Sequence, residues 1–184
     1  MIDLEEYGNL ANDTGAFLDI ELEIQKEALK TWEEKPGQNY FLVEIRDGKL
    51  LAGYCLYHRA ANTDFTMDIH SFVVDRDYRD KGVGVRLLEM VEDELLSTMG
   101  HAILRIEISR KKESIVGDQF FAENGFEMIG HIPDFYEEGN DYYIYVRHVC
   151  PEPDEPEELE SGERLAAEGG PEDKAQKPVE PSVG

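Results

Sequence analysis

The sequence has only two cysteines in its 184 residues, Cys55 and Cys150, and they lie far apart. Neither belongs to a C-x-x-C pair, so a disulfide framework or a zinc site is not expected. A chain of this length can bury a hydrophobic core without such cross-links. We therefore expect a globular protein that needs no metal.

Long apolar runs and positive charges are also scarce. No apolar run approaches the length that spans a bilayer, and the first residues, Met1–Glu6, lack the basic and apolar regions of a signal peptide. With 18 Lys and Arg against 41 Asp and Glu, the net charge is −23, which disfavours nucleic acid and anionic membranes as partners. We expect a cytoplasmic protein. Its charge favours a cationic partner through electrostatic steering, although solubility alone also accounts for it.

Aromatic residues are absent from residues 150–184. This segment holds six of the eight prolines, and from Pro151 onward it carries eleven acidic residues against three basic ones. Such a composition buries too little apolar surface to offset the entropy of ordering. The sequence therefore predicts a domain over residues 1–149 and an acidic, disordered tail over residues 150–184.

The most informative stretch runs from Phe72 to Met99. It is typical of a buried strand, a polar loop and an amphipathic helix, because apolar residues recur at helical spacing after the loop. The loop contains Arg79-x-x-Gly82-x-Gly84, whose glycines allow a ligand close to the backbone, while the first N–H groups of the helix lack partners. Four basic residues against two acidic ones surround it, so the loop indicates an anion-binding site.

Two common phosphate-binding motifs do not fit this loop. A Rossmann fingerprint needs a third glycine where the sequence has Leu87, and in a P-loop the lysine follows the glycine, whereas Lys81 precedes it. The loop instead resembles the R/Q-x-x-G-x-G/A loop of the GNAT superfamily of acyl-CoA N-acyltransferases. Two later segments resemble that family in the same order: Phe120–Phe126, similar to its F-Y-x-x-x-G-F helix end, and Asp134–Asp141, similar to the loop before its last strand.

The resemblance implies an α/β fold of the α+β kind, with a mixed, mostly antiparallel central sheet flanked by helices and an opening strand. The sequence predicts a helix from Thr14 to about Pro36, followed by a hairpin around Asp47-Gly48. The apolar stripe of this helix is Phe17, Ile20, Ile24 and either Leu29 or Ala28. The other predicted strands are 67–74, 102–109, 126–132 and 141–149, and a short helix is predicted over 114–124.

The family resemblance also implies a reaction, the transfer of an acetyl group from acetyl-CoA to a primary amine of a small molecule or a protein. A homodimer is compatible with it. The oxyanion would be bound by the backbone N–H of Val73 or Val74. The residues that correspond to the family's pyrophosphate loop are Arg79, Asp80, Lys81, Gly82, Val83, Gly84 and Val85.

Many members of the family use a carboxylate on the central strand as the general base, and its counterpart here is Asp68. An aspartate in an otherwise apolar strand is locally inconsistent, which often marks function, but it could equally be the partner of a nearby cation. His70, two residues further on the same face, is the alternative base, unless it is an ordinary core histidine. Glu107 and Ser109 on the next strand are weaker candidates, and the alternative for Glu107 is a simple pair with Arg105 across one face.

The sequence departs from the family pattern in the short helix. Where the family often has a tyrosine that protonates the leaving thiolate, this chain has Phe121, and Ser114 lies nearest to a missing asparagine. Tyr136 is the phenol we nominate instead, with Tyr142 and Tyr143 behind it. Two hypotheses follow: an acetyl-CoA-dependent N-acetyltransferase, or a non-catalytic acyl-CoA-binding module with an acidic interaction tail.

Overall fold

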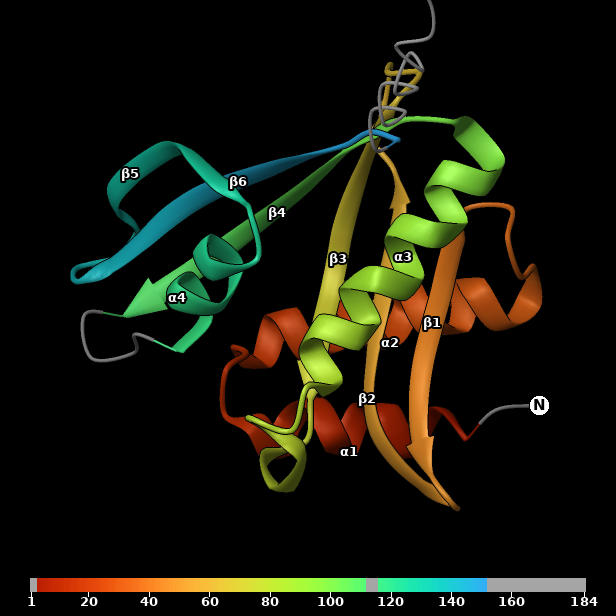
Figure 1. Cartoon of the computed structure of the whole chain (residues 1–184). Coiled ribbons are helices and arrows are strands. Elements are labelled where there is room, and N and C mark those ends of the chain that lie inside the picture. The colour runs from red at the N-terminus through yellow and green to blue at the C-terminus, as the bar shows by residue number, and fades with distance from the viewer. Residues whose placement is uncertain (1–2, 112–115, 152–184) are drawn as a thin grey trace, which may run out of the picture. The chain divides into compact units, whose positions relative to one another are not determined.

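The computed structural model describes residues 3–111 and 116–151. In these residues the strands form one sheet in the order β1-β2-β3-β4-β6-β5, and within it only β3 and β4 run parallel (Figure 1). The prediction of a mixed, mostly antiparallel sheet flanked by helices is confirmed. The elements are α1 (Leu4–Thr14), α2 (Asp19–Glu34), β1 (Tyr40–Asp47), β2 (Leu50–Arg59), β3 (Thr66–Val74), the short 3-10 turn η1 (Arg76–Tyr78), α3 (Val83–Met99), β4 (Ala102–Lys111), α4 (Val116–Glu123), β5 (Glu127–Glu137) and β6 (Asn140–Val149).

The predicted hairpin forms the outer part of the sheet. β1 and β2 pair in antiparallel fashion up to Asp47 opposite Leu50, and Gly48 has the positive φ of 61° that such a tight turn favours. β3 then pairs with the other edge of β2, so that β2 is buried along most of its length. No helix among the described residues is both long and apolar enough to cross a membrane.

Helices cover both faces of these three strands. Figure 1 shows α3 on one face and α1 and α2 on the other. Because successive strand residues point to opposite faces, β2 contributes Tyr54 and Leu56 to the core under α1 and α2, and Cys55 and Tyr57 to the core under α3. The predicted apolar stripe of α3 is confirmed by its buried residues Leu87, Leu88, Val91 and Leu95.

The N-terminal region differs from the prediction. Other members of the family usually open with a strand, and the sequence offers at best a stub of one at residues 2–4; the first element described is instead the helix α1. Asp3 explains this start, because its Oδ1 accepts hydrogen bonds from the N–H groups of Glu5 and Glu6 at 3.1 and 3.4 Å, as an N-cap does. The predicted helix start at Thr14 is also wrong: α1 ends there, and α2 begins at Asp19.

The apolar stripe predicted for α2 is wrong at its centre. Ile20 and Ile24 are 64% and 51% exposed. The last positions of the stripe are confirmed, because Ala28 and Leu29 are buried, but Gln25 is buried where Ile24 was expected. Nε2 of Gln25 donates a hydrogen bond to the hydroxyl of Tyr54, which in turn donates to the carbonyl of Tyr7 at 3.2 Å. A polar residue tolerates this buried position because it has a buried polar partner.

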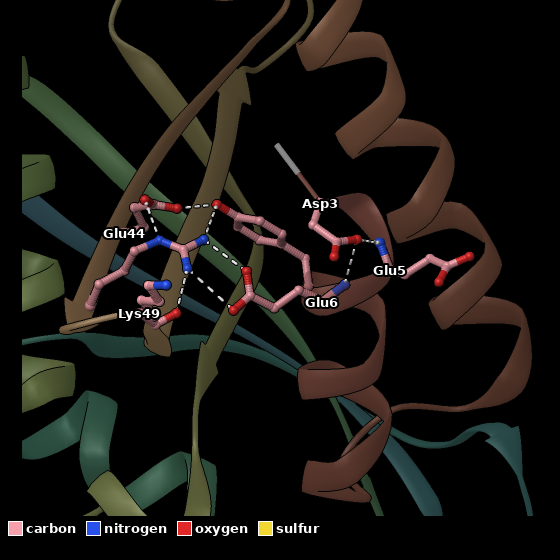
Figure 2. Close-up of polar contacts among 7 residues, drawn as sticks. Asp3, Glu5, Glu6, Glu44 and Lys49 are labelled. Atoms are coloured by element: carbon pink, nitrogen blue, oxygen red, sulfur yellow. Dashed lines mark hydrogen bonds and ion pairs between the residues drawn. The ribbon is translucent and has the colours of Figure 1, made fainter. Parts of the chain in front are cut away.

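A polar network fastens α1 to the hairpin. Arg46 of β1 donates to both carboxylate oxygens of Glu6 at 3.2 and 2.9 Å and to Glu44 at 2.9 Å (Figure 2). The hydroxyl of Tyr7 also donates to Glu44. Paired arginine–carboxylate bonds of this kind fix orientation as well as distance, so the network sets how α1 lies on β1.

The last two strands form a longer hairpin than expected. Residues 134–137 were predicted to lie in a loop, but they belong to β5, which turns into β6 at Glu138 and Gly139. Oδ1 of Asp141 accepts the N–H of Asp134 at 3.0 Å, and Oδ1 of Asp134 accepts the N–H of Gly139 at 2.6 Å. These two carboxylates close the turn, which explains why the strand continues through the predicted loop.

Candidate functional site

The site is organised around the point where two parallel strands separate. β3 and β4 are paired only from Thr66 opposite Ile103 to Ile69 opposite Ile106. Beyond that pair β4 continues along β6 and β3 along β2, and the two strands diverge (Figure 1). We call this point the fork. The first residues beyond it are His70 on β3 and Glu107 on β4.

The backbone of β3 beyond the fork presents free N–H groups to the opening. The N–H of Asp75 bonds to the carbonyl of Ala52 in β2 at 3.0 Å. Because N–H directions alternate along a strand, the N–H of Val73 also points toward β2, whereas those of Phe72 and Val74 point away from it. The side chain of Val73 is buried in the core under α1. Of the two predicted oxyanion donors, the register therefore favours Val74.

A cavity of about 770 Å³ lies beside this part of β3. Its walls come from the link between α1 and α2, the end of β3, the loop before α3, and α4. Among the residues proposed from sequence it is lined by Val74, Arg79, Asp80, Gly84 and Phe121. Asp68, His70 and Tyr136 do not line it. The glycine loop and the short helix, 36 positions apart between Gly84 and Phe120, are thus brought together at one cavity.

The glycine loop has the backbone geometry of an anion site. Gly82 is the N-cap of α3, with φ 81° and no side-chain cap, and Asp80 before it also has a positive φ of 57°. The first helical hydrogen bond runs from the N–H of Arg86 to the carbonyl of Gly82 at 3.0 Å, so the N–H groups of the preceding turn are left for a ligand.

The cations around this loop differ in how strongly they are engaged. Arg76 donates to the carbonyl of Thr14 at 3.0 Å, and the Nζ of Lys81 lies 5.2 Å from the ring centre of Tyr78. Arg79 lines the cavity and forms no ion pair with any residue that the structure describes. Arg79 is therefore the side chain best able to receive an anion here.

Gly84 is required by the packing of α4 against the glycine loop. A Cβ at this position would lie 2.9 Å from two ring atoms of Phe120, which is closer than such atoms approach. Phe121 is buried, and its ring lies against those of Phe72, Phe120 and Phe126. The aromatic cluster thus provides an apolar wall to the cavity, without a hydroxyl at the position of Phe121.

The structure pairs the predicted base with an arginine. Oδ1 and Oδ2 of Asp68 accept hydrogen bonds from Nε and a terminal nitrogen of Arg105 at 2.7 and 2.8 Å. These bonds raise the pKa of Arg105. Glu107 lies 3.6 Å from the same guanidinium, so Arg105 stands between the two carboxylates. The alternative reading of Asp68, as the partner of a nearby cation, describes the contact that is present.

The alternative base, His70, is half-buried next to the fork. The register of β2 with β3 slips by one residue between Leu56 and Tyr57, which leaves His70 as the extra residue of a β-bulge. Its ring lies 5.5 Å from that of Tyr40 and 6.0 Å from that of His58. Burial, and secondarily the neighbouring His58, lower the pKa of His70, so the imidazole is neutral near pH 7.

Acidic and aromatic side chains gather on the α2 side of β4 and the last hairpin. Oε1 of Glu21 accepts the hydroxyl of Ser109 at 3.2 Å, while its Oε2 caps the N–H of Leu18 at 2.7 Å. Burial and the nearby carboxylates of Glu21 and Glu107 raise the pKa of Tyr136. Around Tyr136 lie the rings of Phe135, at 4.9 Å, and Tyr142, at 6.1 Å.

Sequence reasoning missed the partners of these side chains. Arg105 as the partner of Asp68, and Glu21 as the partner of Ser109, join residues 37 and 88 positions apart, and no local pattern indicates such pairs. Ser114 lies outside the described residues. Tyr143 is buried on the α3 face rather than beside Tyr136. Within residues 3–111 and 116–151 no cluster of three His, Cys, Asp or Glu side chains could hold a metal ion.

Comparison with known proteins gives one family match and a partial relative. The model described as the acetyltransferase (GNAT) family matches residues 7–126. An uncharacterized protein of Mycobacterium leprae is 34% identical over 109 residues, which are 58% of this chain and 29% of that protein. The chain therefore spans only a minor part of the length of this relative.

Solved structures share the fold over most of the chain. A protein assigned to the GNAT family of acetyltransferases from Desulfovibrio desulfuricans superposes with a TM-score of 0.74 at 24% identity, over 80% of this chain and 93% of that one. An aminoglycoside 6'-N-acetyltransferase complexed with coenzyme A gives 0.63 at 16%, over 82% and 93%. A ribosomal-protein-alanine N-acetyltransferase from Brucella melitensis gives 0.59 at 18%, over 79% and 93%.

Proposed function

The chain belongs to the GNAT family of acetyltransferases, and on that premise we propose that it transfers the acetyl group of acetyl-CoA to a primary amine. The observation that carries the proposal is the cavity that joins the glycine loop, the free end of β3 and the aromatic wall of α4. An acyl thioester linked to a pyrophosphate needs all three: an anion site, backbone donors and an apolar channel.

The residues present fit the cosubstrate. The N–H groups at the start of α3 and the side chain of Arg79 would hold the pyrophosphate, because both carry positive charge toward the cavity. The related structure that contains coenzyme A has the same fold. The backbone N–H of Val74 would hydrogen-bond the oxyanion that forms when the amine attacks the carbonyl carbon, which is where such donors act.

The acceptor amine must lose a proton before it attacks. Asp68 was the first candidate for this base, but both of its oxygens already accept hydrogen bonds from Arg105. We therefore assign the role of general base to Glu107, whose side chain is 46% exposed and lies at the fork. The neutral imidazole of His70 is the second candidate.

Attack of the amine forms the C–N bond, and collapse of the intermediate breaks the C–S bond. The thiolate then takes a proton from water or from Tyr136.

The surroundings of Glu107 favour a cationic acceptor. Glu21 and Glu107 supply negative charge, and Tyr136 with its neighbouring rings supplies aromatic surface, a combination that attracts ammonium groups. The overall charge of −23 would steer such an acceptor toward the protein. The acceptor amine would approach from the α2 side of the sheet and the thioester from the cavity.

The alternative, a non-catalytic acyl-CoA-binding module, draws support from Phe121. The position at which the family often has a tyrosine is a buried phenyl ring in an aromatic cluster. Binding of CoA without acetyl transfer to any amine in a broad panel would favour the module over the enzyme.

The test combines CoA binding with transfer. Calorimetry should detect binding of CoA to the wild type, and a panel of small amines and peptides should release free thiol from acetyl-CoA. Gly84→Ala should weaken CoA binding at least about tenfold, since its Cβ would push Phe120 into the cavity. Gly100→Ala is the control for strain in the same helix: the positive φ of 75° disfavours alanine there, but a Cβ would have nothing near it and would not reach the cavity. Equal CoA affinity of Gly84→Ala and Gly100→Ala would contradict the placement of CoA.

A further inference from the structure

The strongest side-chain contact at the fork has no role in the chemistry proposed above. Asp68 and Arg105 face each other on the second-last pair of the β3–β4 ladder, one residue before the strands separate. Two short bonds join the guanidinium to the carboxylate, one to each oxygen, and such a bidentate pair is stronger than a single bond. The side chains are 37% and 17% exposed, so solvent weakens the contact only partly.

The fork needs something to fix its position. The ladder between β3 and β4 consists of four residue pairs, and a parallel ladder is less stable per residue than an antiparallel one. Each strand has a firmer partner on its other side, β2 for β3 and β6 for β4. A ladder this short can open from its free end, and the loss of one pair would move the fork by about 3.3 Å.

The β-bulge and the ion pair fix the end of the β3–β4 ladder: the bulge prevents the ladder from growing, and the ion pair prevents it from shortening. The bulge at His70 bends β3, so that the ladder does not continue beyond Ile69. The ion pair lies just inside the last ladder pair and resists opening in the other direction. Their combined effect is to keep His70 and Glu107 as the first residues beyond the fork.

We propose that the Asp68–Arg105 ion pair is a clasp that fixes the fork, and that both residues are positioning residues of the transfer reaction. This inference rests on the proposed function for its kinetic consequences, but the fork itself is a property of the fold. Misplacement of a reacting group by about 1 Å can cost about 100-fold in rate. Loss of the clasp should therefore lower kcat by about 10- to 100-fold and leave CoA affinity unchanged.

The clasp and a catalytic Asp68 predict opposite results for Arg105→Gln. If Asp68 were the base, removal of Arg105 would free its carboxylate and the rate would be kept or raised. If the pair is a clasp, Asp68→Asn and Arg105→Gln should lower kcat alike, and the double variant should be no slower than either single one. The acidic limb of the pH–rate profile should persist in all three variants, because the base is still present.

Arg46→Gln is the matched control. Arg46 also bonds two carboxylate oxygens, those of Glu6, and its side chain is 30% exposed, but it lies in the network under α1. Its loss should lower the unfolding temperature without a change in kcat. This control separates loss of stability from loss of position.

Amide hydrogen exchange measures the fork without any acceptor. The N–H of Ile103 bonds to the carbonyl of Phe65 on the β3 side, so by alternation the N–H groups of residues 105 and 107 also point toward β3. In Arg105→Gln and in the double variant, these two amides should exchange at least about tenfold faster than in wild type, and in Arg46→Gln they should not. If the wild type transfers acetyl to no amine, the proposed function fails, but amide hydrogen exchange still tests the clasp. Wild-type kcat in Arg105→Gln, or unchanged exchange at residues 105 and 107 in that variant, would overturn the clasp.

Discussion

The three strands β1–β3 and the three strands β4, β6 and β5 differ most in what covers them. β2 is buried along nearly all of its length between α1 and α2 on one face and α3 on the other. β5, at the opposite edge of the sheet, is exposed along nearly all of its length. The first half carries the glycine loop, and the second carries the aromatic hairpin.

This difference separates two tasks that the proposed reaction combines. The cosubstrate is the same in every turnover, so its loop gains from a closely packed half. Acceptors differ in shape, and an open half can change its surface residues with little effect on the core, since surface substitutions rarely alter stability by more than about 0.5 kcal/mol. The two halves are in register only through the four pairs at the fork.

The largest effect we expect tests which half supplies the base. Glu107→Gln, in the second half, should lower the transfer rate by about 10²–10⁴-fold, the usual contribution of a general base, and should remove the acidic limb of the pH–rate profile. CoA affinity, measured by calorimetry, should stay as in wild type. His70→Gln is the counterpart from the first half. If it alone abolishes the acidic limb, the base belongs to the packed half instead.

Substitutions of an apolar residue in each half should differ in how much they lower the free energy of unfolding. Leu56 of β2 is fully buried, and Leu56→Ala should lower the free energy of unfolding by about 2–5 kcal/mol, the usual cost of such a cavity. Ile132 of β5 is 46% exposed, and Ile132→Ala should lower it by well under half as much. Urea denaturation measures both. Equal losses would show that the outer hairpin is packed as tightly as the centre.

A smaller effect concerns alkaline pH and the network under α1. Burial, with Glu44 as the second cause, raises the pKa of Tyr7 from 10.0 to about 12. A raised pKa means that the folded state holds the proton more tightly, so this contribution to stability is complete below pH 10 and is lost as the pH rises toward about 12. In urea denaturation at pH 9, 10 and 11, Tyr7→Phe should lose less stability with rising pH than the wild type does. A parallel decline in both proteins would show that other groups govern the alkaline loss.

The packed half was largely predictable from sequence. The Asp47-Gly48 turn and the stripe of α3 are local patterns, and each sets the structure of its own segment. The errors lie in α2, where Ile20 and Ile24 are exposed and Gln25 is buried. Gln25 is buried because it donates a hydrogen bond to the hydroxyl of Tyr54, 29 positions away. A local sequence pattern does not show such a distant partner.

The site was predictable in its backbone but not in its side chains. Glycine spacing identifies a place where a ligand can approach, because only the main chain is involved. The partner of Asp68 depends on the register of two parallel strands joined through a whole helix. That register is set by the packing of α3 and by the bulge at His70, so the sequence identified a carboxylate at the fork without its arginine.

The four-pair junction also has a consequence for the order of folding. Everything in the first half, from α1 to the glycine loop, precedes β4 in the chain, and β1, β2 and β3 are joined by short connections. Such local contacts form early, and domains are synthesised from the N-terminus. β4 can join β3 only after α3 has been made, and β6 must then pair with β4. We therefore expect the loop that would receive CoA to form before the fork, and closure of the fork to complete the proposed site.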